Sequence, residues 1–85
     1  MAKLTHRQGQ FLAFIHLYWL LHRRGPAEAD FRAYFRITPP SVHQMIVRLE
    51  ELGAITRESG VARSARVAVP VEDVPALEPV EGPAW

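Results

Sequence analysis

The sequence predicts a mainly α-helical fold with a small β-hairpin, that is, a winged helix-turn-helix of three helices followed by a two-stranded wing. Three observations carry this prediction. Apolar residues recur at helical spacing in three segments before residue 53. Only residues 37–38 separate the second segment from the third, as in a helix-turn-helix. After Gly53 the apolar residues alternate, which is typical of strands.

The first helix is expected to run from about Thr5 to Arg24. Thr5 is a suitable N-cap and Gln8 completes the capping-box pattern, while Gly25 is expected to help end the helix. Its expected core face is Phe11, Phe14, Ile15, Tyr18 and His22. Its other faces are also apolar, with Leu12, Leu17, Trp19, Leu20 and Leu21. A helix that is apolar nearly all round is normally buried all round, so we expect the C-terminal tail or a second subunit to cover it. The alternative is that some of these residues remain exposed, as single apolar residues often do.

The second helix is expected at residues 28–36, with Phe31, Tyr34 and Phe35 spaced for core packing. The third helix is expected at residues 38–52. Thr38 is its expected N-cap, Pro39 suits its first position, and Gly53 supplies the left-handed residue that ends it. The residues expected to be buried on it are Val42, Met45, Ile46, Leu49 and Leu52. The opposite, exposed stripe is expected to hold Pro40, Gln44, Val47 and Glu51.

The hairpin is expected to consist of strands at residues 54–58 and 65–69, joined by a wing loop at residues 59–64. Residues 1–69 are therefore assigned to the winged helix domain. Residues 70–85 are assigned to an acidic, Pro-rich tail, which is expected to be extended because closely spaced prolines oppose regular helix and sheet.

The net charge of +1 conceals an asymmetry, because residues 1–69 carry +5 and residues 70–85 carry −4. A basic body is typical of a domain that binds a polyanion. The chain has no Cys, and its four His show no metal-like clustering, so we expect neither a metal nor a cofactor. No catalytic set or phosphate-binding loop is visible, which argues against an enzyme. With no signal sequence and no apolar span of about 20 residues, the expected location is the cytoplasm, without membrane association.

Several motifs resemble, in order along the chain, the DNA-binding domain of LexA-type repressors. They are Leu4-Thr5-His6-Arg7-Gln8, Gly25-Pro26, Pro40-Ser41-Val42-His43, Leu49-Glu50-x-Leu52-Gly53-Ala54-Ile55 and Ala62-Arg63-Ser64. The resemblance extends from Leu4 to about Val69. LexA-type repressors also carry a self-cleaving protease domain with a Ser/Lys pair. This sequence has no Lys after Lys3, so we expect it to be without that domain.

The residues and the resemblance together predict a sequence-specific protein that binds double-stranded DNA as a small transcriptional regulator. The third helix (38–52) would enter the major groove and the wing loop would lie on the phosphate backbone. The expected DNA-binding residues are Thr5, Arg7, Thr38, Pro40, Ser41, His43, Gln44, Arg48, Arg57, Arg63, Ser64 and Arg66. A homodimer through the first helix, the tail or both is also expected. The alternative is a winged helix that binds another protein through the same apolar helix and tail, without binding DNA.

Overall fold

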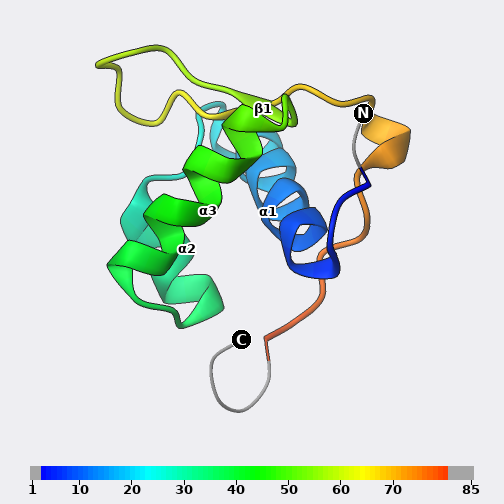
Figure 1. Ribbon diagram of the computed structural model, residues 1–85, viewed down its shortest axis with the longest axis horizontal. Helices are drawn as coiled ribbons and strands as arrows, with labels where there is room; N and C mark the ends of the chain where they lie inside the picture. Colours follow the sequence, from blue (N-terminus) through cyan, green and yellow to red (C-terminus); the bar gives the residue numbers. More distant parts are fainter. Residues whose placement is uncertain (1–2, 81–85) are drawn as a thin grey trace.

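The computed structural model describes residues 3–80, which form three α-helices and a two-stranded antiparallel sheet (Figure 1). The helices are α1 (His6–His22), α2 (Glu28–Phe35) and α3 (Pro39–Glu51). The other elements are β1 (Ile55–Thr56), β2 (Arg66–Val67) and a short 3₁₀ helix, η1 (Val71–Asp73). In the sheet, Ile55 lies opposite Val67 and Thr56 opposite Arg66. The predicted winged helix-turn-helix architecture is confirmed.

Helix α1 begins with the predicted capping box. The Thr5 hydroxyl accepts the Gln8 amide at 3.1 Å, and the Gln8 side chain accepts the Thr5 amide at 2.9 Å. The helix ends at His22, two residues before the predicted end, because Arg23 adopts a left-handed backbone conformation (φ 60°). Gly25 is needed for another reason, since a Cβ there would lie 2.7 Å from the Ala65 carbonyl oxygen and only glycine permits this close approach.

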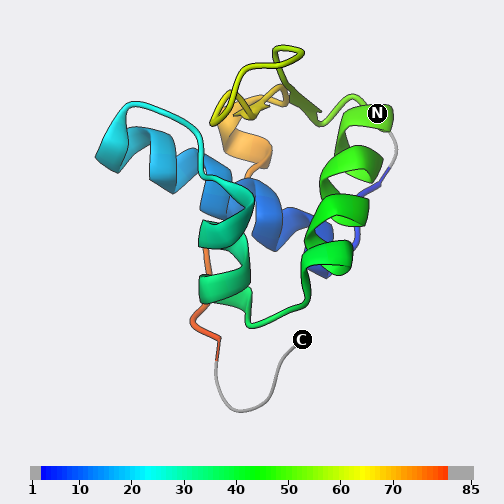
Figure 2. The ribbon, with the colours of Figure 1, turned by 90° about the vertical axis from the view of Figure 1, so that its left-hand side faces the viewer.

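Helices α2 and α3 are joined by residues 36–38 and form the helix-turn-helix, which is seen from the side in Figure 2. Gly53 has φ 76° and follows the end of α3, as predicted. Thr38 occupies the N-cap position of α3, but the prediction that its side chain caps the helix is wrong. The Thr38 hydroxyl lies 2.9 Å from the Ser41 hydroxyl, so it is engaged with a side chain and not with a backbone amide.

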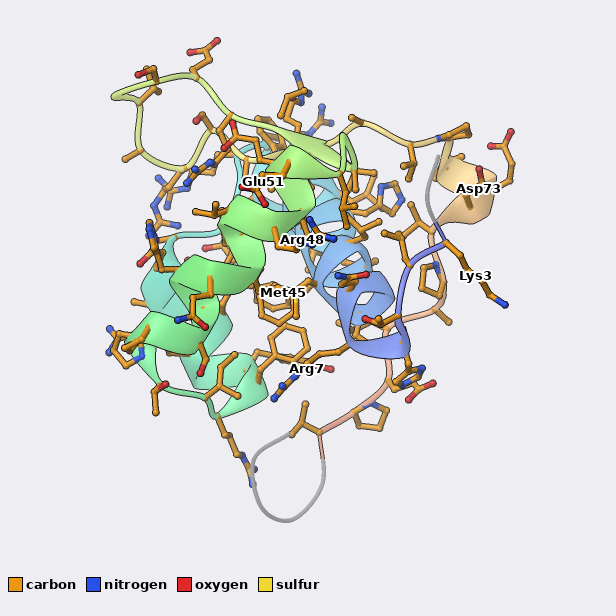
Figure 3. The ribbon with its side chains drawn as sticks, in the orientation of Figure 1. Lys3, Arg7, Met45, Arg48, Glu51 and Asp73 are labelled. Carbon is orange, nitrogen blue, oxygen red and sulfur yellow. The ribbon has the colours of Figure 1, made fainter. Side chains whose placement is uncertain are left out.

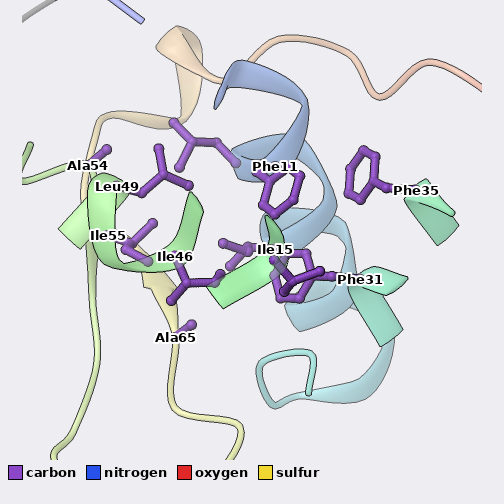
Figure 4. Packing of buried hydrophobic residues seen from close by; sticks show 11 residues of the cluster. Phe11, Ile15, Phe31, Phe35, Ile46, Leu49, Ala54, Ile55 and Ala65 are labelled. Atoms are coloured by element: carbon purple, nitrogen blue, oxygen red, sulfur yellow. The ribbon is translucent and has the colours of Figure 1, made fainter. Parts of the chain in front are cut away.

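The core lies where the three helices and the hairpin meet, and most of it is shown in Figure 4. The buried cluster is Phe11, Leu12, Ile15, Phe31, Phe35, Val42, Ile46, Leu49, Ala54, Ile55 and Ala65. The Phe11 ring stacks on Phe35 and Phe31, with centroids 4.5 and 5.0 Å apart. Two sequence-based assignments on α1 were wrong. Leu12, placed outside the core face, is fully buried, and His22, placed on that face, is exposed.

Each strand is shorter than predicted, with two residues in place of five. The ladder is extended at one end by the Ala68 amide, which donates to the Ala54 carbonyl at 2.8 Å. Towards the wing loop, Ser64 bonds the Glu58 amide through its side chain, and Arg63 adopts a left-handed conformation (φ 56°). Because of these two features, the backbone beyond Thr56 and Arg66 does not continue the antiparallel hydrogen-bonding pattern, and strand pairing ends there.

Residues 70–80 of the tail run along α1 and reach α2 (Figures 1 and 2). Val74, Leu77 and Val80 pack against the core, and the buried Gln10 side chain bonds two backbone groups of the tail. The tail therefore covers part of α1, which is one of the alternatives that the sequence left open for its second apolar face. The division at residue 70 stays a prediction, and residues 81–85 lie outside the described part.

The C-terminal half of α1 keeps an exposed apolar ridge, named here the α1 ridge, formed by Leu17, Leu20 and Leu21. Their exposed fractions are 38%, 61% and 75%. Of the other residues assigned to the second apolar face, Leu12 is buried in the core and Trp19 is half-buried beside Ala65 and Arg66. Among residues 3–80, no helix has the length and apolar character needed to cross a membrane.

Candidate nucleic-acid interface

Helix α3 has two unlike faces, and its polar face is open. Val42 and Leu49 on the inner face are fully buried, and Ile46 is nearly so. The predicted contact residues on this helix and at its start are all exposed: Thr38, Pro40, Ser41, His43, Gln44 and Arg48. Figure 3 labels Arg48 and Glu51, which are exposed, and Met45, which is half-buried and packs against the edge of the core. The described residues therefore leave the polar face of α3 uncovered.

The two side chains assigned to base reading are free to move. Gln44 is exposed, and its side chain forms no hydrogen bond with any residue between 3 and 80. Arg48 lies 3.7 Å from Glu51, but both side chains are about 60% exposed, so this ion pair contributes little to stability. Both side chains can therefore contact a ligand on that face while losing little interaction energy within the chain.

Other predicted contact residues of the helix-turn-helix region are already engaged. The His43 ring lies 3.4 Å from the Glu28 carboxylate, which links α3 to the start of α2. The Thr5 hydroxyl caps α1, although the residue itself is exposed. Arg7, two residues further along, is half-buried and also has a partner within the chain.

Two cations of the hairpin are held against neighbouring elements. Arg57 donates to one oxygen of Glu50 from Nη2 at 2.8 Å and from Nε at 3.3 Å, which ties the end of β1 to α3. The guanidinium of Arg66 lies 4.1 Å from the centre of the Trp19 ring, a cation–π arrangement. Both guanidinium groups keep unused N–H donors that a phosphate could accept.

Arg63 and Ser64, predicted to contact DNA from the wing loop, both have hydrogen-bond partners within the chain. One guanidinium nitrogen of Arg63, Nη1, donates to Asp30 at 2.9 Å and to the Tyr18 hydroxyl at 3.1 Å. Ser64 donates to the Val61 carbonyl at 2.8 Å and accepts the Glu58 amide at 2.9 Å. Arg63 is therefore bonded to α1 and α2, whereas Ser64 is bonded to residues of the hairpin itself.

The Asp30–Arg63 pair is ionised at neutral pH. Partial burial acts to raise the pKa of the Asp30 carboxyl, but hydrogen bonds from Ala27, Arg63 and Tyr18 outweigh it and hold that pKa below its usual value. The hydrogen bond with Tyr18 raises the pKa of Arg63, with partial burial opposing and Asp30 adding to the rise. Both charges are therefore present over the whole physiological range.

Sequence reasoning missed the partners of these cations. It placed Tyr18 on the expected core face of the first helix and Trp19 among its other apolar residues, and it assigned no partner to Arg63 or Arg66. Asp30 and Arg63 are 33 residues apart, and no local spacing signals their contact. Within the described part of the chain, no group of three or more His, Cys, Asp or Glu residues is placed to hold a metal ion.

Three helices with an exposed polar face on the third, followed by a short hairpin, define the class as winged helix-turn-helix. No family model matches the chain. It is 34% identical over 82 residues to the LexA repressor of Thermosipho melanesiensis, covering 96% of this chain and 40% of that protein. It is also 34% identical over 79 residues to the LexA repressor of Thermosipho africanus, covering 85% of this chain and 40% of that protein. The chain thus spans about two fifths of these curated relatives, and the LexA-type resemblance is supported over that region.

Proposed function

We propose that this chain binds double-stranded DNA in a sequence-specific manner and regulates transcription. The observation that carries the proposal is the uncovered polar face of α3, on a helix whose opposite face is firmly buried. A helix of this kind fits the major groove, with its first turns towards the base edges. The similarity to two proteins described as LexA repressors supports a regulatory role.

In this proposal α3 reads the sequence and the other elements hold the phosphate backbone. Gln44 would bond an adenine edge and Arg48 a guanine edge. The residues that flank them at the start of α3 are Thr38, Pro40, Ser41 and His43. Backbone contacts would come from Thr5 and Arg7 at the start of α1 and from Arg57, Arg66 and Ser64 in the hairpin. Residues 1–69 would carry all of these contacts, and residues 70–80 would brace α1.

Gln44→Ala and Arg48→Ala should each change the preferred sequence at one base position. Each side chain is expected to supply about 1–3 kcal/mol of discrimination there. The measurement is selection of bound sequences from random duplex DNA by the natural chain and by each variant. Arg23→Ala is the matched control, because it removes an exposed cation at the end of α1 that is not among the proposed base contacts. Identical preferences in all four proteins would contradict the placement of the reading face.

The salt dependence of binding tests the proposal as a whole. The logarithm of the binding constant should fall linearly with the logarithm of salt concentration. The slope of this line should be about −0.9 for each phosphate that the protein contacts. A chain that shows no salt-dependent binding to duplex DNA would contradict the proposal. That outcome would favour the protein-interaction alternative.

We also propose a homodimer that forms through the α1 ridge. One module of this size buries little DNA surface, and specific sites are commonly read by dimers. The apolar residues Val74 and Leu77 of the tail are packed on the chain's own core, so α1 is favoured over the tail as the interface.

The dimer can be tested with Leu20→Asp, at a side chain that is 61% exposed and therefore not needed for the core. Burying a Leu contributes about 1.5–3 kcal/mol, so the charge should weaken the dimer by at least roughly tenfold. Analytical ultracentrifugation measures the change, and circular dichroism should show an unaltered helix content. A natural chain that stays monomeric at every accessible concentration would refute the dimer.

A further inference from the structure

The wing loop is tied to α1 and α2 through both side-chain and backbone groups. The Arg63 guanidinium bonds the Tyr18 hydroxyl and the Asp30 carboxylate. The Gly25 amide donates to the Arg63 carbonyl at 2.9 Å. Next along the chain, the Trp19 indole donates to the Ala65 carbonyl at 2.6 Å. Residues 63–65 are therefore fixed to the helical body at several points.

Asp30 connects this attachment to the helix-turn-helix. Its Oδ2 atom accepts both the Arg63 guanidinium at 2.9 Å and the Ala27 amide at 2.8 Å. The Ala27 amide precedes the first turn of α2, where backbone donors have no partner within the helix. One carboxylate oxygen thus joins the start of α2 to the point where the wing loop turns back towards β2.

We propose that Asp30 and Tyr18 act through Arg63 as a clasp that fixes the wing loop, and that Arg63 is a positioning residue in DNA binding and not a phosphate contact. This inference rests on the proposed function. In the competing arrangement, Arg63 leaves Asp30 and binds a phosphate.

The two arrangements predict opposite effects of Asp30→Asn on the affinity for DNA. If Arg63 binds phosphate, loss of the carboxylate frees the guanidinium and removes a charge that repels DNA, so binding strengthens. If the clasp is correct, the wing loop loses its fixed position and binding weakens despite the more favourable net charge.

The test compares Asp30→Asn with Asp73→Asn in the full chain. Asp73 is an exposed acid of η1 with no ion pair among residues 3–80, so it provides the same charge change away from the wing loop. We expect Asp30→Asn to weaken binding to a selected duplex roughly threefold to tenfold, a modest effect because both charged groups are about a third exposed. Asp73→Asn should leave binding unchanged or slightly stronger.

Hydrogen exchange of the Gly25 amide gives a readout that does not depend on DNA. Asp30→Asn should speed this exchange by a similar factor, because the acceptor of that amide is the Arg63 carbonyl. Tyr18→Phe, which removes only the hydroxyl, should give a smaller change of the same sign. If Asp30→Asn does not fold, Tyr18→Phe carries the same test. An unchanged Gly25 exchange rate in a folded variant would overturn the clasp.

Arg63→Ala completes the test. The measured quantity is the slope of the logarithm of the binding constant against the logarithm of salt concentration. If Arg63 positions the wing loop, Arg63→Ala should weaken binding and leave this slope unchanged. If Arg63 contacts a phosphate, the magnitude of the slope should fall by about 0.9. A reduced slope, or tighter binding by Asp30→Asn, would overturn the proposal. A natural chain that binds no DNA would refute the proposed function and with it the DNA-binding role of Arg63, while the Gly25 exchange would still decide whether the clasp exists.

Discussion

Leu12→Ala is expected to lower the free energy of unfolding by about 2–5 kcal/mol. Leu12 is fully buried in the cluster that joins α1 to the other helices and the hairpin, so truncation removes apolar contacts and leaves a cavity. Native domains are stable by only about 5–15 kcal/mol, so the loss is a large share of the total. Chemical denaturation followed by circular dichroism measures the loss. The midpoint denaturant concentration should fall, while the dependence of the unfolding free energy on denaturant concentration stays unchanged.

Leu20→Ala is the matched control, because it makes the same chemical change on the same helix. Leu20 is 61% exposed, so the expected change in the free energy of unfolding is within about 0.5 kcal/mol. The comparison should be made at concentrations where ultracentrifugation shows a monomer, since Leu20 lies on the α1 ridge. Equal losses for the two variants would contradict the packing described for α1.

This pair of leucines shows how far the sequence could predict the fold. The alternation of apolar and polar residues, the capping box at Thr5 and the left-handed Gly53 are local signals, and each led to the correct element. Leu12 and Leu20 carry no such signal, because α1 is apolar on several faces. What separates them is which turn of α1 the rest of the chain covers, and that depends on tertiary packing.

The candidate site shows the same limit. The exposed side of α3 could be predicted because Val42, Ile46 and Leu49 mark the buried side by their spacing. The inward direction of Arg63 could not, because its acceptor on Asp30 is 33 residues away. A cation in a loop looks like a free charge until the fold brings an acid to it, so local reasoning overestimates the number of available cations.

Gln10 is the one buried polar residue among residues 3–80, and Gln10→Ala is expected to lower the free energy of unfolding by about 2–3 kcal/mol. The side chain is 1% exposed and donates to the Ala76 carbonyl at 3.0 Å while accepting the Glu78 amide at 2.8 Å. Truncation leaves both backbone groups of the tail without their partner, at about 1–3 kcal/mol for each group that stays shielded from water. The tail should then detach from α1 more readily, which faster amide exchange at Glu78 would report.

Gln10→Glu separates the hydrogen bonds from packing, because it keeps the size of the side chain. The carboxylate still accepts the Glu78 amide, but its second oxygen then faces the Ala76 carbonyl with no proton to donate. Stability should therefore be lower than in the natural chain at neutral pH. The deficit should shrink as acid protonates the carboxyl, since the protonated group regains a donor. A deficit that does not change with pH would mean that packing, and not the hydrogen bond to Ala76, fixes the tail.

Gln44→Ala is the control for Gln10→Ala, and the two should give opposite results in two measurements. Gln44 is exposed on α3 and its side chain has no hydrogen bond among residues 3–80, so its truncation should change the free energy of unfolding by no more than about 0.5 kcal/mol. It should nevertheless change the base preference, whereas Gln10→Ala should lower stability and leave that preference intact. If Gln10→Ala also altered the preferred bases, the tail would contribute to DNA reading, and its assignment as a brace on α1 would be wrong.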